Sequence, residues 1–298
     1  MTKLTMAGLA LLICGALVAA ACSPVRAFDL VMPKDGTSRK VASDVAYGPG
    51  PRHRLDIYAP VARADRPLPV IIFIYGGSWA SGTREGYHFA ARALAAGGFL
   101  VVVPDYRLVP EVHFPGFIED CATATKWVRA RARNYGADPD KIILVGHSAG
   151  AYNAAMLALD PRFLGTDRTA IKGFAGLAGP YDFLPLDGPV PIRTFGGWPR
   201  LDETQPITYA DKSAPAVLLL HGAQDRTVWP KNSINLDRKL RAAGAASELK
   251  IYSDLGHVGI VTALARPFRG KAPVLDDLLA FARRVTSAGA ERTELAGR

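Results

Sequence analysis

A serine between small residues ends an apolar run at residues 141–150, KIILVGHSAG. Such a run is typical of a strand buried on both faces, and the residues after it have the pattern of a helix. A serine at this kind of turn is lifted out of the sheet in a strained backbone conformation, so its neighbours must be small, as Gly146 and Gly150 are. We therefore predict that Ser148 is a nucleophile, and that the Ala149 N–H at the helix N-terminus helps to bind an oxyanion.

A serine hydroxyl is a weak nucleophile at neutral pH and needs a neighbouring base. Asp225 follows one buried apolar run in VLLLHGAQDRTV, and His257 follows the next predicted strand in IYSDLGHVGI. Loops after parallel strands open at one edge of the sheet, where ligands bind. We therefore predict a catalytic triad in which Ser148 attacks the acyl carbon, His257 moves the proton and Asp225 orients the imidazole.

Other residues offer alternatives for these roles. Asp254 is a second candidate acid, but it precedes His257 by only three residues, which is too close to brace the ring from its far side. Asp182 is a weaker alternative, and a lone histidine such as His257 is more often a surface residue. The position of His257 one strand after the acid loop favours the catalytic role.

The surrounding segments alternate between apolar strands and amphipathic helices, which predicts a mostly parallel sheet covered on both faces, an α/β fold. The predicted strands are 54–60, 70–75, 99–107, 141–145, 171–177, 216–221 and 247–254, and the predicted helices are 86–96, 117–133, 149–159, 232–243 and 273–285. Residues 28–52 are expected to lead into the first strands. Residues 179–215, rich in Pro, Gly and aromatic residues, are expected to form a small insertion over the end of the sheet.

Several motifs in order along residues 54–283 resemble those of a known family: YGGSW at 75–79, DYRLVPEVHFPGFIEDC at 105–121, then GHSAG, HGAQD and GH. This set is similar to that of the α/β-hydrolase carboxylesterases, which include hormone-sensitive-lipase-like enzymes, bacterial feruloyl and acetyl esterases, and kynurenine formamidases. The resemblance implies the α/β-hydrolase fold and a second part of the oxyanion hole in the N–H groups of Gly77 and Ser78.

The YGGSW loop departs from the family pattern at two positions. Tyr75 stands where the family usually has a histidine that braces the loop, and Ser78 replaces the commoner glycine or aromatic residue. A tyrosine can still brace the loop through its hydroxyl group. Four aromatic residues near the proposed site are candidates to wall a substrate pocket, although core packing is the usual role of such residues: Trp79, Phe195, Trp198 and Trp229.

The composition argues against several other classes of protein. The chain has 298 residues, of which 49% are hydrophobic, and a net charge of +9. The basic residues are scattered rather than gathered, which argues against nucleic-acid binding and leaves a basic protein that could work near an anionic surface. The three cysteines, Cys14, Cys22 and Cys121, have neither metal-ligand nor disulfide spacing, and no phosphate loop is present, so we expect no metal and no cofactor.

Residues 1–27 have the layout of a secretory signal peptide: an early lysine, an apolar stretch from Met6 to Ala21, then small residues. The stretch is short for a membrane-spanning helix, which favours export. Two processing sites compete. Cleavage before Cys22 would give a lipoprotein with a lipidated cysteine, tethered to a membrane, whereas cleavage after Ala27 would release a periplasmic protein.

Together these features predict one α/β-hydrolase domain over 28–298 that hydrolyses carboxylic esters of small to medium acyl chains through an acyl-enzyme. The expected partner is a small-molecule ester. An arylformamidase or other amidase would use the same triad, and a non-catalytic binding module of the same fold is the alternative from another class. The acyl preference and the oligomeric state stay open.

Overall fold

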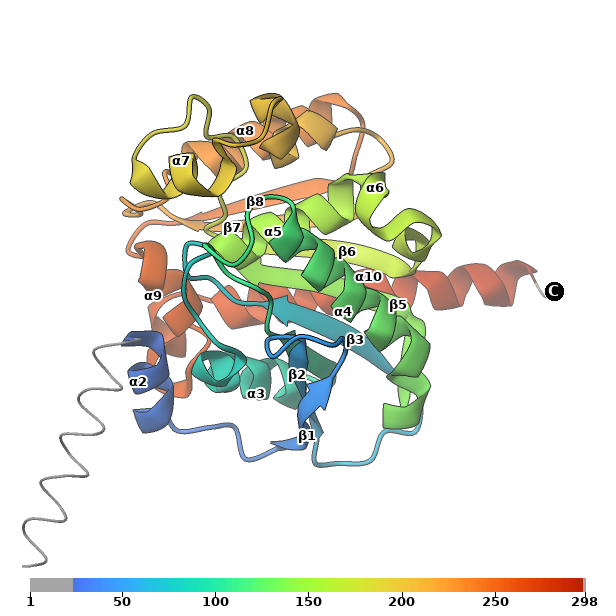
Figure 1. Ribbon diagram of the computed structural model, residues 1–298. Coiled ribbons are helices and arrows are strands. Elements are labelled where there is room, and N and C mark those ends of the chain that lie inside the picture. Colours follow the sequence, from blue (N-terminus) through green and yellow to red (C-terminus); the bar gives the residue numbers. More distant parts are fainter. Residues whose placement is uncertain (1–23, 297–298) are drawn as a thin grey trace, which may run out of the picture.

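A computed structural model describes residues 24–296 as one mixed eight-stranded sheet with helices on both faces (Figure 1). The strand order is β1-β2-β4-β3-β5-β6-β7-β8; β2 pairs antiparallel with β1 and β4, and all other neighbours are parallel. The strands are β1 (Ser38–Ala46), β2 (Arg54–Pro60), β3 (Leu68–Ile74), β4 (Leu100–Pro104), β5 (Ala137–His147), β6 (Ile171–Leu177), β7 (Ala216–Gly222) and β8 (Ser247–Tyr252).

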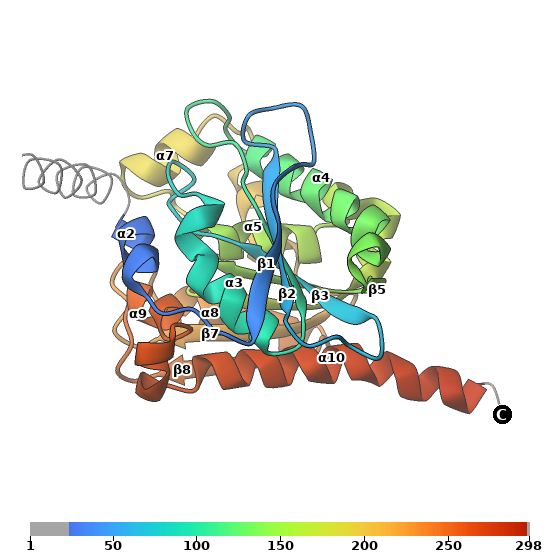
Figure 2. The same cartoon turned by 90° about the horizontal axis from the view of Figure 1, so that it is seen from below.

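The longer helices form a layer on each side of the sheet (Figures 1 and 2). Helices α4 (Gly116–Arg131) and α5 (Ala149–Leu159) pack together on one face, and α3 (His88–Ala96) and α10 (Val274–Ala296) lie on the other. Helix α8 (Lys231–Ala242) packs against β7 and β8. The predicted α/β architecture is confirmed.

The central strands are buried because both of their faces are covered by helices. All residues from Val70 to Ile74 in β3 and from Ile142 to Val145 in β5 are fully buried, which explains why these segments are continuous apolar runs. Burying one such aliphatic side chain contributes about 1.5–3 kcal/mol to stability.

The differences from the sequence prediction include an additional strand and a longer helix. Strand β1 was expected only as a lead-in, because SRKVASDVA is mostly polar; it is an edge strand with most of its residues partly or fully exposed. Helix α10 continues to Ala296, well beyond the predicted end at residue 285.

The predicted insertion, residues 179–215, contains one short helix, α7 (Pro189–Phe195), and the 3₁₀ turns η4 (Leu201–Thr204) and η5 (Pro206–Tyr209). Helix α7 lies at the upper left of Figure 1, at the end of the molecule toward which β3 points. The insertion therefore lies at the carboxyl edge of the parallel strands.

The first described element, α2 (Pro24–Val31), is packed against the rest of the chain. The Phe28 ring lies 5.1 Å from the ring of Phe89 and 5.7 Å from that of Phe268, and the Asp29 carboxylate accepts a 2.6 Å hydrogen bond from the Phe89 N–H. The predicted signal boundary after Ala27 falls inside this helix, whereas Cys22 lies outside the described residues. No helix of residues 24–296 is long and apolar enough to cross a membrane.

Candidate active site

Ser148 occupies a sharp turn between β5 and α5, with φ 55° and ψ −124°. Glycine is required on both sides of it. A Cβ atom at Gly146 would lie 2.3 Å from the Gly150 carbonyl oxygen, and one at Gly150 would lie 2.0 Å from the Ile74 carbonyl oxygen. The Ser148 N–H donates a 2.9 Å hydrogen bond to Leu177 at the end of β6, which fixes the turn against the sheet.

Three side chains from distant loops meet at the carboxyl edge of the sheet. His257 is the first residue of α9 (His257–Thr262). The Nε2 atom of its ring lies 2.9 Å from the Ser148 Oγ, and the Nδ1 atom lies 2.7 Å from the Asp225 Oδ2. Ser148 is 9% exposed and Asp225 only 1%. The hydroxyl is thus reachable from solvent, while the carboxylate is shielded behind the imidazole.

The Asp225 carboxylate is held from several directions. Its Oδ1 accepts 2.8 Å hydrogen bonds from the N–H groups of Thr227 and Val228, and its Oδ2 lies 3.2 Å from the His221 Nε2 as well as close to His257. Burial alone would raise the pKa of Asp225, but the hydrogen bonds from His221, His257 and the Val228 N–H, together with the charge of His257, hold the pKa below its ordinary value. Asp225 is therefore a carboxylate shared by two imidazoles.

The second imidazole was missed in the sequence, where His221 reads only as a strand end. Its Nε2 lies 2.8 Å from the Val228 carbonyl oxygen, so Nε2 carries the proton, and its Nδ1 accepts from the Ser233 hydroxyl at 2.7 Å. The spacing of four residues between His221 and Asp225 in HGAQD was the only available signal.

The alternative acids lie elsewhere. Asp254 is exposed, and its carboxylate accepts a hydrogen bond from the neighbouring Ser253 hydroxyl. Asp182 accepts a 2.7 Å hydrogen bond from the Asn235 side chain. Only Asp225 among the three weighed carboxylates touches the His257 ring.

The YGGSW loop faces Ser148 in a conformation that side chains rarely adopt. Gly77, Ser78 and Trp79 have φ values of 139°, 54° and 56°. A Cβ atom at Gly77 would lie 2.2 Å from the Ser81 carbonyl oxygen. In the described part of the chain, the N–H groups of Gly77, Ser78 and Ala149 donate to no backbone carbonyl, so all three are available to a ligand oxygen.

Tyr75 anchors the start of this loop. Its hydroxyl donates a 2.7 Å hydrogen bond to the Asp105 carboxylate and accepts a 2.8 Å one from the Arg52 guanidinium. The Tyr106 hydroxyl in turn donates to the Tyr75 carbonyl at 2.9 Å. Burial, reinforced by Asp105, raises the pKa of Tyr75 well above its ordinary value. The tyrosine hydroxyl thus links the loop to β4 and to the chain before β2.

A further histidine, His147, ties the loop of His257 to the turn that carries Ser148. Its Nε2 donates a 3.0 Å hydrogen bond to the His257 carbonyl, and its Nδ1 is buried with no hydrogen-bond partner in the structure. Burial, together with the neighbouring His257, lowers the pKa of His147 to about 3. His147 is therefore a neutral donor, a role that its position inside the GHSAG motif does not reveal.

A cavity of about 710 Å³ opens over Ser148. Its walls are mainly apolar and come from the YGGSW loop, the insertion and the loop after β7. They include Ser78, Trp79, Ser148, Ala149, Phe183, Leu184, Leu186, Val190, Val228, Trp229 and several prolines, with Asp187, Lys231 and Asn232 as polar members. The volume is in the range of small-molecule sites.

Of the four aromatic residues proposed for the pocket, only Trp79 and Trp229 line it. Phe195 is 1% exposed and packs edge-on beneath Trp79, with ring centres 4.9 Å apart. Trp198 packs on Phe114 and lines a different groove. Both predictions were wrong because these rings pack into the apolar interior between the insertion and α4.

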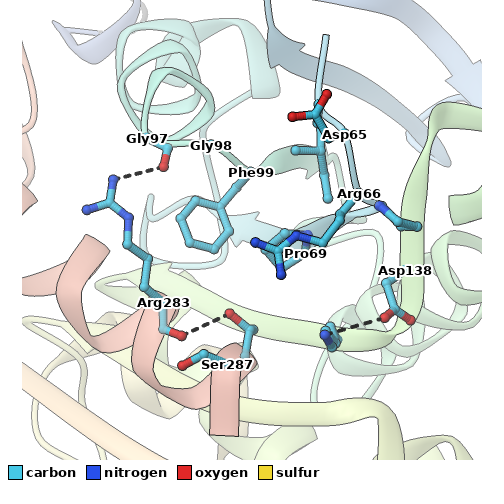
Figure 3. A pocket seen from close by; sticks show the side chains of 14 residues that line it. Asp65, Arg66, Pro69, Gly97, Gly98, Phe99, Asp138, Arg283 and Ser287 are labelled. Carbon is cyan, nitrogen blue, oxygen red and sulfur yellow. Dashed lines mark hydrogen bonds and ion pairs between the residues drawn. The ribbon is translucent and has the colours of Figure 1, made fainter. Parts of the chain in front are cut away.

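A second hollow of about 550 Å³ lies at the opposite edge of the sheet (Figure 3). It is bordered by Leu68 and Pro69 at the start of β3, by Phe99 just before β4, and by Arg283 of α10, whose guanidinium donates to the Gly97 carbonyl. Ligands of such sheets bind at the carboxyl ends of the strands. This hollow lies at the amino ends of β3, β4 and β5, so it is separate from the site at Ser148. Nowhere in residues 24–296 do three His, Cys, Asp or Glu side chains gather as a metal site.

Two family matches cover different parts of the chain: the BD-FAE family over residues 55–188 and the prolyl oligopeptidase family over residues 196–288. The chain is 30% identical over 256 residues to the probable isoprenylcysteine alpha-carbonyl methylesterase ICME of Oryza sativa subsp. japonica, covering 78% of this chain and 61% of that protein. It is 35% identical over 228 residues to esterase LipQ of Mycobacterium tuberculosis, covering 69% and 54% respectively. The chain thus spans little more than half the length of these relatives.

Solved structures share the fold. An inhibited form of esterase B from Lactobacillus rhamnosis superposes with a TM-score of 0.81 at 20% identity, covering 95% of this chain and 97% of that one. A carbohydrate esterase from gut microbiota superposes with a TM-score of 0.74 at 22% identity, covering 86% and 99%. From its fold, its family matches and its relatives, the chain belongs to the α/β-hydrolase esterase family.

Proposed function

We propose that this protein is a serine esterase that hydrolyses carboxylic esters of small to medium acyl groups. One observation carries the proposal: the Ser148 hydroxyl, the His257 ring and the Asp225 carboxylate form a line of contacts of 2.9 and 2.7 Å beside three unused backbone N–H groups. Esterase names among the curated relatives support it.

In the proposed reaction the Ser148 oxygen attacks the acyl carbon while the His257 Nε2 takes the hydroxyl proton and returns it to the leaving alcohol. Water activated by His257 then hydrolyses the acyl-enzyme. The N–H groups of Gly77, Ser78 and Ala149 bind the oxyanion, and one such donor is worth about 2.7–4 kcal/mol in the transition state. Asp225, held as an anion, stabilises the imidazolium that forms in each half of the reaction.

The test of this mechanism replaces the nucleophile. Ser148→Ala is expected to lower kcat for p-nitrophenyl acetate by at least about 10⁴-fold, because it removes the attacking oxygen and leaves only binding and the oxyanion donors. Ser253→Ala, on the exposed loop just before His257, is the matched control and should keep the parent rate. Stopped activity assays and far-UV circular dichroism would separate lost chemistry from lost folding.

A fluorophosphonate probe provides a second readout. Stoichiometric labelling of Ser148 is expected, and mass spectrometry would locate the adduct. Wild-type turnover in Ser148→Ala, or labelling at another serine, would refute the nucleophile. Folded protein that neither reacts with the probe nor hydrolyses any ester would instead indicate a non-catalytic binding module.

The substrate class is proposed from the cavity. Its apolar walls and its volume of about 710 Å³ suit an ester with a short or medium acyl chain. The relatives named as isoprenylcysteine methylesterases add the case of a methyl ester of a bulky apolar acid. The measurement compares kcat/KM for acetyl, butyryl, octanoyl and feruloyl esters with kcat/KM for aryl formamides, which ranks the substrate classes. A higher kcat/KM on formamides would reassign the enzyme as an amidase.

We also propose that residues preceding the described part direct export, and that processing occurs before Cys22. The packing of α2 supports this choice, because cleavage after Ala27 would divide the helix and leave Phe28 at a new N-terminus. The protein would then be a membrane-tethered lipoprotein. Mass spectrometry of the native N-terminus distinguishes a diacylated Cys22 from an N-terminal Phe28.

A further inference from the structure

We infer that the end of the molecule that carries the active-site mouth docks onto the surface of an anionic lipid bilayer, so that the enzyme acts on esters held in that surface. The docking edge consists of Leu30 and Val31 of α2, Leu184 and Ile192 of the insertion, Trp229 after β7, and Val258 of α9. The choice of substrates rests on the proposed esterase function, whereas the docking itself does not.

The docking edge is apolar where a water-facing surface would be polar. Leu30 and Val31 are 71% and 73% exposed, and Ile192, Trp229 and Val258 are each more than half exposed. Most of the large apolar side chains that are exposed in the described part of the chain lie at this one end. Such a concentration marks an interaction surface.

These residues share one end of the fold. Helices α2, α7 and α9 all lie at the left end of the molecule in both views (Figures 1 and 2). The Phe28–Phe268 contact ties α2 to the segment that follows α9. Leu184 and Trp229 also line the cavity over Ser148. A surface that covers the docking edge would therefore face the opening of the active site.

The basic side chains around the mouth, set against one exposed carboxylate of the cavity wall, Asp187, favour an anionic surface as the partner. Three basic side chains are exposed there: Arg193 beside Ile192, Arg226 directly after Asp225, and Lys231 at the cavity wall. Within residues 24–296 none of them forms an ion pair with a carboxylate. The Arg226 guanidinium lies 5.5 Å from the Trp229 ring centre. Aromatic rings and unpaired cations together suit the headgroup region, where each basic residue near an anionic bilayer adds about 1 kcal/mol.

The position of the chain's N-terminal part agrees with this orientation. The apolar stretch from Met6 to Ala21 precedes α2 directly, and α2 is part of the docking edge. A membrane attachment through Cys22 or through this stretch would hold the docking edge, rather than the opposite edge of the sheet, against the lipid. A protein partner or a second copy of this chain has no comparable support in the structure.

Fluorescence of a label on an introduced cysteine tests the orientation, with the native cysteines of the parent chain as background. The full chain with Ile192→Cys carries an environment-sensitive NBD label at the docking edge, and Val61→Cys carries it at the opposite edge; the two parent side chains are 54% and 55% exposed. The labelled parent chain serves as the blank. On phosphatidylglycerol vesicles we expect a blue shift and quenching by brominated lipid at residue 192 but not at residue 61.

A charge reversal tests the electrostatic part. Arg193→Glu should weaken the residue 192 signal on phosphatidylglycerol vesicles by about fivefold or more at low salt, as loss of one basic contact predicts. Arg63→Glu, exposed at the opposite edge, should not. Phosphatidylcholine vesicles should give weak signals with all variants.

Activity provides the last arm. Ile192→Ser should lower the rate on a vesicle-embedded ester at least about fivefold relative to Val61→Ser, while hydrolysis of soluble p-nitrophenyl acetate stays unchanged. Three results would each overturn the inference. The residue 192 label could stay in water on vesicle-bound protein, the labels at residues 61 and 192 could shift equally, or the docking edge could be buried in a dimer in solution. If the parent protein hydrolyses no ester but the residue 192 signal is intact, the proposed function is contradicted while the docking remains supported.

Discussion

At the scale of single residues, the site depends on hydrogen bonds from two buried histidines that the sequence motifs do not display. His221 donates toward Asp225, and His147 donates to the carbonyl of His257. Neither lines the cavity over Ser148, so we expect both to act as positioning residues. Their removal should disturb catalysis through the geometry of the triad rather than through lost chemistry.

His147 makes stability depend on pH in a predictable direction. Its pKa of about 3 in the folded protein lies below the value of about 6.5 in an unfolded chain, so acid protonates the unfolded state first. The contribution is complete above pH 6.5 and is lost as the pH falls toward 3, by about 1.4 kcal/mol for each pH unit. The free energy of unfolding should therefore drop by about 2 kcal/mol between pH 7 and pH 5 from this residue alone.

Urea unfolding of His147→Gln at both pH values checks this. The variant should lose about 2 kcal/mol less than the parent over the same interval, and its kcat should fall because the amide replaces the imidazole donor imperfectly. His113→Gln, an exposed histidine, is the control. Identical pH dependence in parent and His147→Gln would contradict a buried neutral histidine at this position.

At the scale of elements, the approach of α5 to β3 sets the position of Ser148. Gly150→Ala would place a Cβ atom 2.0 Å from the Ile74 carbonyl oxygen, so the helix must move away from the strand. We expect the variant to fold, with a free energy of unfolding about 1–3 kcal/mol lower than that of the parent, and to have a lower kcat. Gly197→Ala, where nothing lies within 4 Å of the added atom, should be close to neutral.

Chemical denaturation and p-nitrophenyl acetate kinetics on both variants would measure this. A Gly150→Ala protein as stable and as active as Gly197→Ala would show that α5 can shift without consequence, which the close approach argues against.

The elements also show what a sequence can and cannot predict. Strands β3 and β5 could be predicted because burial on both faces requires a continuous run of apolar residues. Strand β1 was missed because an exposed edge strand has no apolar pattern. Phe195 and Trp198 were misplaced because an aromatic residue has the same identity whether it faces a cavity or a core, and His221 and His147 were missed because their partners are distant in the chain.

At the scale of the whole molecule, α2 closes the end of the fold near the active site. Phe28→Ala removes the ring that packs between Phe89 and Phe268 and should lower the free energy of unfolding by about 1–3 kcal/mol, less than for a fully buried ring. The helix should also become sensitive to protease. Leu30→Ala, on the exposed face of the same helix, should have little effect.

Thermal unfolding and limited proteolysis with N-terminal sequencing of the fragments would compare the two variants. Equal resistance of Phe28→Ala and the parent would mean that α2 contributes nothing to the folded domain, and the argument for processing before Cys22 would lose its support.

The tyrosine that anchors the YGGSW loop has a consequence for acidic surroundings. The family pattern places a histidine there, a group that gains a proton within the range of natural pH, whereas burial and Asp105 keep the Tyr75 hydroxyl protonated and uncharged far beyond it. The anchoring tyrosine therefore does not change its own charge as the pH falls. A loop anchored in this way can keep its shape while the acidity of the surroundings changes.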